Sequence, residues 1–251
     1  MPNTRYVVFT DLDGSLLDHS DYSFEEALPM LAFLKSNNID LIYTTSKTKI
    51  ECELLQEKMG INSPFIVENG ACIYYDDKTF DQLGRDHQEV VCFLDRYKKQ
   101  FAIDSFSDLS LKELMAYTGF DAKRALFARQ RNFSEPFLLR DQKKLPFLRE
   151  TAQKEGFKIL EGGRFYHCVG AKQDKGEAIK RVLRKYKGYT SIALGDSPND
   201  IAMLKVADKA ILIPRYDNTY IDIDLPDLIK ARSPGSKGWN ESLKRVFFED
   251  S

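Results

Sequence analysis

The sequence predicts an α/β fold, with a doubly wound, mostly parallel sheet and an inserted α+β unit. Short β-branched and aromatic runs alternate with helical patterns near both ends of the chain. The middle of the chain breaks this alternation with several helices and closely spaced strands. Strands that alternate with helices indicate a parallel sheet with helices on both of its faces.

In the first third of the chain we expect strands at 6–10, 39–43, 65–67 and 71–75. Ser23 and Glu26 have the spacing of a capping box, which predicts a helix to about residue 36, kinked near Pro29. A second helix is expected over 48–59 and ends at Gly60. Asp76 and Asp77 mark a turn after the fourth strand.

The middle of the chain predicts the α+β insertion, with a capping box at Ser110 and Glu113. Its expected helices are 88–101, 111–117, 122–130 and 145–154, and its expected strands are 137–139, 157–160 and 165–169. The βα pattern then resumes with a helix at 175–186, strands at 191–194 and 210–213, and a helix from about Trp239. We therefore expect a main unit of residues 1–82 and 169–251 and an inserted unit of residues 83–168.

Composition narrows the range of possible partners. Lys and Arg number 37 against 38 Asp and Glu, so no overall field attracts nucleic acid or an anionic membrane. The sequence has no signal-like start and no stretch of about 18 apolar residues. The four cysteines lack the paired spacing of a zinc or redox site and are expected to be reduced thiols. We expect a soluble, cytoplasmic protein.

Acidic and hydroxyl side chains follow the expected strands, at the sheet edge where α/β proteins bind ligands. They are Asp11, Asp13, Thr45, Ser46, Asp196 and Asp200, with Lys47 and Lys175 nearby. Four carboxylates in a small volume raise one another's pKa unless a cation neutralises them. Oxygen ligands without a His or Cys cluster favour Mg²⁺, which suits Asp11 and Asp196, with Asp200 as a further candidate.

These residues suit transfer of a phosphoryl group. Asp11 has the position of a nucleophile that forms an aspartyl-phosphate, and Asp13 that of a general acid and then base. Thr45, Ser46 and Lys175 can stabilise the charge on the phosphoryl oxygens. No GxxxxGK[ST] loop occurs and no GxGxxG follows the first strand, so a nucleotide-binding loop is not predicted.

Four segments resemble the motifs of haloacid-dehalogenase-type phosphatases, in the same order: 11–17 (DLDGSLL), 45–47 (TSK), 175–176 (KG) and 195–200 (GDSPND). Segments 45–48, 68–70, 133–135 and 162–167 are similar to the mannosyl-3-phosphoglycerate phosphatase family. Ser15 stands where many relatives carry Thr. The resemblance implies a Rossmannoid core with an inserted cap, and a role in mannosylglycerate biosynthesis. It also implies Mg²⁺ held by Asp11, Asp196 and the backbone carbonyl of Asp13, and a small phosphorylated glycosyl-glycerate as substrate.

Several residues are candidates for contact with that substrate. Gly163 and Arg164 could bind a carboxylate, although a hairpin turn with a solvated Arg explains them too. Lys47 either reaches the substrate or caps a helix. The other candidates, each with a structural alternative, are Asn69, Gly70 and His167. Arg131 and Glu135 either line the cap side of the cleft or belong to a charged surface, and His19 and His87 are expected at the surface.

Two other functions compete with the phosphatase. A phosphosugar mutase would return the phosphoryl group to another oxygen of the sugar, and a sugar-phosphate sensor would bind without turnover. Within the phosphatase reading, mannosyl-3-phosphoglycerate is the first expectation, and glucosyl-3-phosphoglycerate or another sugar phosphate is the alternative. The oligomeric state is left open.

Overall fold

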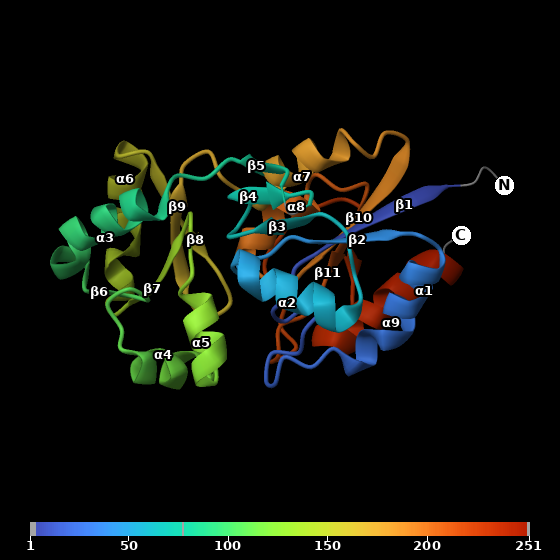
Figure 1. Ribbon diagram of the computed structural model, residues 1–251, viewed down its shortest axis with the longest axis horizontal. Helices are drawn as coiled ribbons and strands as arrows, with labels where there is room; N and C mark the ends of the chain where they lie inside the picture. Colours follow the sequence, from blue (N-terminus) through green and yellow to red (C-terminus); the bar gives the residue numbers. More distant parts are fainter. Residues whose placement is uncertain (1–3, 77, 250–251) are drawn as a thin grey trace.

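The computed structural model describes residues 4–76 and 78–249, which form a larger and a smaller lobe side by side (Figure 1). The larger lobe, called the core below, contains both ends of the described chain. The smaller lobe, called the cap, is built from the middle of the sequence. Asp77 lies outside the described residues, whereas Asp76 accepts the N–H groups of Lys78 and Thr79 in a turn.

A five-stranded parallel sheet forms the centre of the core. In spatial order its strands are β12 (Ile229–Lys230), β11 (Lys209–Leu212), β10 (Tyr189–Gly195), β1 (Arg5–Thr10) and β2 (Asp40–Tyr43). The predicted α/β class with a mostly parallel sheet is confirmed. The two-residue strand β12 was not predicted.

Helices cover both faces of this sheet. Val8 of β1 packs into one apolar cluster, whereas Val7 and Phe9 pack into another, as the two-residue period of a strand requires. The first cluster includes residues of α1 (Leu28–Ser36), α2 (Lys49–Met59) and α9 (Gly235–Phe248). The second includes residues of α7 (Lys175–Leu183) and α8 (Ile201–Leu204). This double covering explains why the strands are almost continuously apolar.

The helix ends show which capping signals were informative. Thr48 and Glu51 form a capping box at the start of α2, and Gly60 ends that helix with φ 64°. The capping box predicted at Ser23 and Glu26 is wrong, because a 3₁₀ turn (Glu25–Ala27) precedes α1 and has no side-chain cap. Pro29 therefore lies in the first turn of α1, where its missing N–H has no intrahelical partner to lose.

A small antiparallel sheet extends the core on the side of β2. Its strands are β3 (Phe65–Val67), β4 (Cys72–Tyr74) and β5 (Phe80–Gln82). A single parallel bridge between Thr44 and Ile66 joins β3 to the end of β2. The residues that follow β3 are thereby brought to the same edge as the ends of β1 and β2.

The cap contains a four-stranded antiparallel sheet. In spatial order its strands are β6 (Ile103–Ser105), β7 (Glu135–Leu139), β9 (Tyr166–Gly170) and β8 (Phe157–Glu161). Helices α3 (His87–Phe101) and α6 (Leu145–Lys154) share its apolar cluster. A smaller cluster holds α4 (Leu111–Thr118) and α5 (Ala122–Ala128), and the predicted capping box at Ser110 and Glu113 starts α4. A 3₁₀ turn (Gln142–Lys144) precedes α6 in the cap, and another (Pro198–Asp200) precedes α8 in the core.

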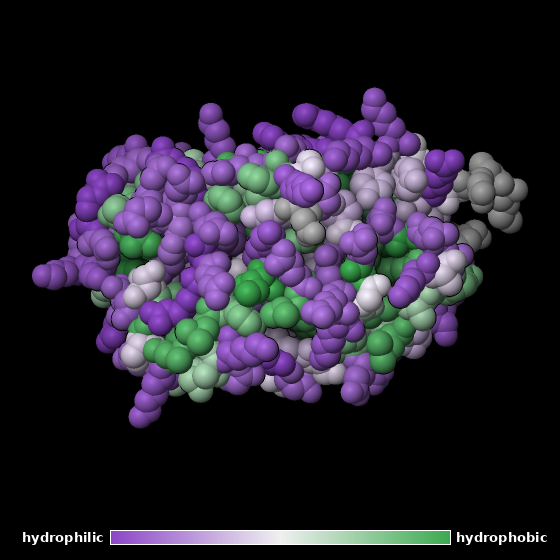
Figure 2. All heavy atoms as spheres, viewed as in Figure 1, coloured by the Kyte–Doolittle hydropathy of each residue, from purple (hydrophilic) through white to green (hydrophobic). Residues whose placement is uncertain are grey.

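The surface is mostly hydrophilic on the face in Figure 2. Apolar side chains are exposed at separate places, such as Leu54 on α2 and Leu126 on α5. Among the described residues, no helix has the length and apolar character needed to cross a membrane.

Candidate active site

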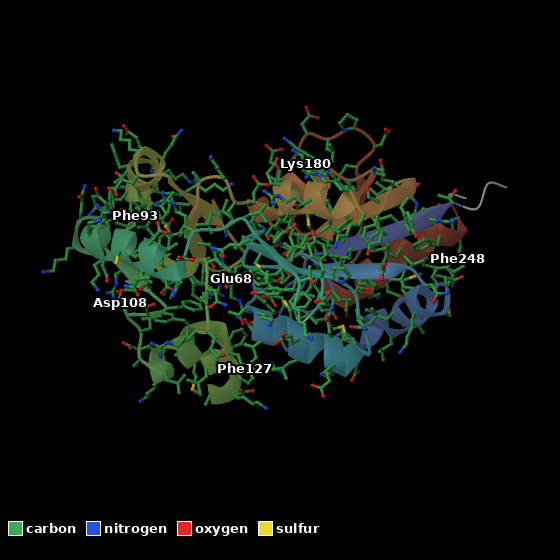
Figure 3. The ribbon with its side chains drawn as sticks, turned by 45° about the horizontal axis from the view of Figure 1, so that its top comes forward. Glu68, Phe93, Asp108, Phe127, Lys180 and Phe248 are labelled. Carbon is green, nitrogen blue, oxygen red and sulfur yellow. The ribbon has the colours of Figure 1, made fainter. Side chains whose placement is uncertain are left out.

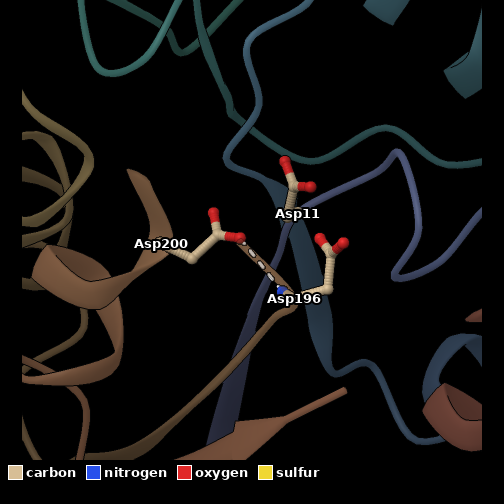
Figure 4. A group of neighbouring side chains, drawn as sticks. All are labelled: Asp11, Asp196 and Asp200. Carbon is tan, nitrogen blue, oxygen red and sulfur yellow. Dashed lines mark hydrogen bonds between the residues drawn. The ribbon is translucent and has the colours of Figure 1, made fainter. Parts of the chain in front are cut away.

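The acidic residues predicted at the strand ends meet at one point of the core. Asp11 follows β1, and Asp196 and Asp200 follow β10. Each offers one carboxylate oxygen, and these atoms lie within 4.8 Å of one another (Figure 4). All three residues are buried, so this negative charge is largely shielded from water.

The backbone around Asp11 is fixed from two sides. The N–H of Asp11 donates to the carbonyl of Leu194 (2.9 Å), which ties the end of β1 to β10. Trp239 of α9 donates from Nε1 to the hydroxyl of Thr10 (3.0 Å), and that hydroxyl donates to the carbonyl of Asp11 (2.7 Å). The backbone of Asp11 is therefore held in part by a helix far along the sequence.

The loop after β1 requires glycine at position 14. Gly14 has φ 82°, a left-handed conformation that glycine adopts readily. A β-carbon at this position would lie 2.6 Å from Oδ2 of Asp196. The hydroxyl of Ser15 donates to Oδ1 of Asp196 over 3.4 Å. The loop thus passes close to the carboxylate of Asp196 and holds it in place.

Lys175, the first residue of α7, joins two of the carboxylates. Its Nζ donates to Oδ1 of Asp11 (2.7 Å) and to Oδ1 of Asp200 (2.6 Å), and the side chain is fully buried. Burial opposes its charge, but the charges of Asp11 and Asp200 prevail and hold the pKa of Lys175 above its usual range. Lys175 is therefore a fixed positive charge beside Asp11.

Asp200 also organises the loop that carries Asp196. Its Oδ2 accepts the N–H groups of Asp196 (3.1 Å) and Ser197 (3.0 Å) and the hydroxyl of Ser197 (3.1 Å). The bond to Asp196 is the dashed line in Figure 4. Both oxygens of Asp200 thus accept hydrogen bonds from the protein, whereas the Asp11 and Asp196 carboxylates are less engaged.

The charge balance of this cluster favours a cation. Burial raises the pKa of Asp11 to about 7, and the charges of Asp200 and Asp13 add to the effect against the influence of Lys175. Burial, together with Asp200 and Asp11, also raises the pKa of Asp196 well above its usual range. Ionising such a group of carboxylates requires more positive charge than Lys175 supplies. The donor set, oxygen atoms only, fits a hard divalent ion such as Mg²⁺.

Asp13 and Lys47 form an ion pair at the mouth of the site. Lys47 Nζ lies 2.8 Å from Oδ1 of Asp13 and 3.6 Å from Oε1 of Glu51. Burial by itself lowers the pKa of Lys47, but the charges of Asp13 and Glu51 outweigh burial and hold this pKa above its usual range. The helix cap considered as an alternative role for Lys47 is supplied by Thr48.

Three predicted residues do not line the cavity between the core and the cap. Thr45 is fully buried, and its Oγ1 accepts the N–H of Lys47 (3.1 Å). Asn69 is fully buried and accepts a hydrogen bond from Asn199 Nδ2 (2.8 Å). Gly70 packs so closely that a β-carbon would lie 2.2 Å from the carbonyl oxygen of Asp174. Asn69 and Gly70 do not line the cavity described below, so their contact with a sugar stays a prediction.

A cavity of about 100 Å³ lies between the acidic cluster and the cap. Eight of the predicted site residues line it: Asp11, Asp13, Ser46, Lys47, Gly163, Arg164, His167 and Asp196. Among the lining residues not predicted to bind substrate are Tyr22, Phe120, Asn199 and His19. The last was expected at the surface. No sequence motif marks Tyr22 and Phe120, which come from a loop of the core and a loop of the cap.

From the cap, Arg164 and His167 line this cavity in addition to Arg131 and Thr118. Arg164 donates from Nη1 to the carbonyl of Thr118 (2.7 Å) in the cap and from Nη2 to the carbonyl of His19 (2.8 Å) in the core. His167 is buried, and its Nδ1 has no hydrogen-bond partner among the described residues. Burial, with Arg131 and Lys175 nearby, lowers the pKa of His167 to about 3. It is thus a neutral imidazole that can bond to a ligand.

The fold and the site together define an α/β protein with a cluster of buried aspartates at the carboxyl ends of its parallel strands. The chain belongs to the haloacid dehalogenase-like hydrolase family, whose sequence profile matches residues 8–215. This match confirms the resemblance in the four segments described above.

Two characterised relatives match over nearly the whole chain. The glucosyl-3-phosphoglycerate/mannosyl-3-phosphoglycerate phosphatase of Persephonella marina is 45% identical, over 97% of this chain and 97% of its own. The enzyme of the same name from Methanococcoides burtonii is 32% identical, over 95% of this chain and 96% of its own. The prediction of a phosphatase of this superfamily is confirmed by these matches.

Solved structures share the fold. A protein from Thermoplasma acidophilum has a TM-score of 0.74 at 18% identity, over 97% of this chain and 99% of its own. A phosphatase of the haloalkanoate enzyme superfamily from Bacteroides thetaiotaomicron has a TM-score of 0.71 at 15% identity, over 97% of this chain and 96% of its own. These structures share the fold of this chain over nearly its whole described length.

Proposed function

We propose that this chain is a Mg²⁺-dependent phosphomonoester hydrolase that acts through a phosphorylated Asp11. The observation that carries the proposal is the buried cluster in which Lys175 bonds to both Asp11 and Asp200, with Asp196 beside them. This cluster lies under a cavity to which Lys47 and Arg164 contribute positive charge. Such a site suits a phosphate group held over a carboxylate nucleophile.

In the proposed first step, a carboxylate oxygen of Asp11 attacks phosphorus and the bond to the leaving oxygen breaks. Asp13 lies at the cavity and gives its proton to that oxygen. In the second step, Asp13 takes a proton from a water molecule, which attacks phosphorus and releases inorganic phosphate. Asp11 is then a free carboxylate again. Lys175 orients Asp11 and favours its ionised form before the first step.

We propose that Asp11, Asp196 and the backbone carbonyl of Asp13 hold Mg²⁺, and that Asp200 adds its charge to the site. Bound there, the ion would neutralise the carboxylates and the phosphate oxygens. Because both oxygens of Asp200 already accept hydrogen bonds, its main proposed role is to orient Lys175 and the loop that carries Asp196.

For the substrate we propose mannosyl-3-phosphoglycerate or glucosyl-3-phosphoglycerate, in line with the names of the two relatives. The glycerate carboxylate requires a cation near the phosphate, and Arg164 and Lys47 both line the cavity. Ser46 and the backbone at Gly163 offer further polar contacts there. The unpartnered Nδ1 of His167 is a proposed contact for a hydroxyl group of the substrate.

Phosphate release from a panel of esters tests this proposal. The panel contains mannosyl-3-phosphoglycerate, glucosyl-3-phosphoglycerate, sucrose phosphate and simple hexose phosphates, each with and without Mg²⁺. We expect a preference for the first two and dependence on Mg²⁺. Conservation of the phosphate on a different oxygen of the sugar would instead indicate a mutase.

The variant Asp11→Asn tests the nucleophile. An amide is a poor nucleophile, so this variant should fold but release no phosphate. Substantial turnover by Asp11→Asn would remove Asp11 from the proposed role. Thermal unfolding of the variant serves as the control for folding.

We place the enzyme in the cytoplasm, without a nucleic-acid or membrane partner. Its four cysteines are free thiols, as expected for a reducing compartment. The near balance of 37 basic and 38 acidic residues gives no general attraction to polyanions. We propose residues 83–168 as the cap domain that sets specificity, although β9 continues to Gly170.

A further inference from the structure

Glu68 is a buried carboxylate that lies outside the catalytic cluster. It follows β3 and is fully shielded from solvent. Figure 3 shows it where the core meets the cap. Glu68, Asn69 and Gly70 have φ values of 48°, 61° and 87°, three left-handed residues in succession. The left-handed conformation is unfavourable for a glutamate, so it persists only where other contacts compensate.

The compensating contacts are made with the cap. Oε1 of Glu68 accepts the N–H of Asn132 (2.9 Å). Oε2 accepts the N–H groups of Phe133 (3.1 Å) and Ser134 (2.9 Å) and the hydroxyl of Ser134 (2.8 Å). These donors belong to the cap segment between α5 and β7. Four hydrogen bonds to one carboxylate make a strong, well-defined joint between the lobes.

The same turn also holds the segment that returns from the cap to the core. Gln173 donates from Nε2 to the carbonyl of Glu68 (2.6 Å), and Gly70 packs against the backbone of Asp174. Lys175 is the next residue along the chain. The turn at 68–70 therefore connects the cap segment 132–134 with the residue that bonds to Asp11.

A second contact strengthens this joint from the cap side. Arg131 donates from Nη1 to the carbonyl of Ser46 (3.0 Å) in the core and to the hydroxyl of Ser134 (3.1 Å). Elsewhere the contacts between the lobes include the Arg164 bond to His19, the Thr48 hydroxyl bond to the carbonyl of Phe127 (3.1 Å), and the Tyr22 and Phe120 rings, 5.2 Å apart. The contact between the lobes around Glu68 thus contains more charge-assisted hydrogen bonds than the contact around Arg164.

We propose that Glu68 is a positioning residue that fixes where the cap stands over Asp11. It acts through segment 132–134, which lies beside Arg131 and leads into the cap sheet that carries His167. Loss of its charge leaves the Asp11 cluster intact but loosens the cap residues above it. This inference rests on the proposed function insofar as the substrate must touch both lobes at once.

Glu68→Gln tests the inference, since the side chain keeps its shape but loses its charge and one acceptor oxygen. Glu113→Gln is the matched control, because Glu113 bonds to a backbone N–H and a hydroxyl of Ser110 entirely within the cap. Both variants are compared with the unaltered enzyme on glycosyl-3-phosphoglycerate and on p-nitrophenyl phosphate, whose leaving group lacks the carboxylate and the sugar. Amide hydrogen exchange at 132–134 is measured in parallel, without substrate.

For Glu68→Gln we expect kcat/KM on glycosyl-3-phosphoglycerate to fall by about tenfold to a hundredfold, mostly through KM. The kcat/KM for p-nitrophenyl phosphate should stay within about twofold of that of the unaltered enzyme, because the chemistry at Asp11 is unchanged. Exchange at 132–134 should become faster, and Glu113→Gln should change none of these quantities. Equal losses on both esters, or unchanged exchange at 132–134, would overturn the inference.

The outcome can be separated from that of the proposed function. If the unaltered enzyme does not hydrolyse glycosyl-3-phosphoglycerate, the proposed substrate is wrong. In that case hydrogen exchange at 132–134 in the two variants still decides whether Glu68 holds the cap.

Discussion

Replacing Gly14 by alanine should disturb the site through one identifiable contact. The new β-carbon would lie 2.6 Å from Oδ2 of Asp196, whereas ordinary contact begins at 3.4 Å. The carboxylate or the loop must therefore move by the difference, 0.8 Å. Displacement of a catalytic group by about 1 Å can reduce the rate by about a hundredfold. We expect kcat/KM of Gly14→Ala to fall by tens of fold and its Mg²⁺ requirement to rise.

Gly188 provides the matched control. Its φ is 78°, against 82° for Gly14, but a β-carbon there would meet nothing within 4 Å. Gly188→Ala should therefore lose only the left-handed backbone preference, about 1–2 kcal/mol of unfolding free energy. Gly14→Ala should lose this amount and about 1–3 kcal/mol more from overpacking.

The assays are thermal unfolding and steady-state phosphate release over a range of Mg²⁺ concentrations. For a domain of this size, each kcal/mol corresponds to about 2–4 °C in Tm. Gly14→Ala should thus unfold at a lower temperature than Gly188→Ala, and only Gly14→Ala should lose activity. Equal kinetic constants for the two variants would refute the reasoning, because the contact with Asp196 would then have no effect.

Three further changes have distinct expected outcomes. Lys175→Met leaves two buried carboxylates without their partner and should cost about 3–5 kcal/mol of stability, so an unchanged Tm would contradict the ion-pair geometry. Arg164→Ala should mainly raise KM, and unchanged kinetic constants would return this residue to a purely structural role. Because the pKa of His167 falls from 6.5 to about 3 on folding, the unfolded chain binds more protons below pH 6.5. The contribution of His167 to stability should then decrease by up to about 1.4 kcal/mol per pH unit between pH 6.5 and 3, and it is measured as the difference in slope between the unaltered protein and His167→Asn in pH-dependent unfolding experiments.

The parallel core could be predicted because its strands have strong local signals. The apolar run at 6–10 and the acidic residues after it identify both a strand and its functional end. The strands β5, β6 and β12 were missed because each is only two or three residues long and polar at one or more positions. Their pairing depends on neighbours that are distant in the sequence.

Some residues of the site could likewise be predicted from the sequence, and others could not. Asp11, Lys175 and Asp196 lie in motifs, and the fold brings them together as expected. Tyr22 and Phe120 reach the cavity only because a loop of the core and a loop of the cap meet there. Asn69 and Gly70 have the composition of an exposed turn, but Asn69 is buried and Gly70 packs against Asp174. Sequence patterns indicate a turn here without giving its direction.

The chain of hydrogen bonds from Trp239 through Thr10 to Asp11 has a consequence for biosynthesis. Trp239 follows Asp11 by more than two hundred residues, so a ribosome adds it much later. The nascent polypeptide therefore contains Asp11, the proposed nucleophile, long before the indole that is hydrogen-bonded to Thr10 is made. Catalytic competence should arise late in translation, so an unfinished product would not consume phosphorylated metabolites.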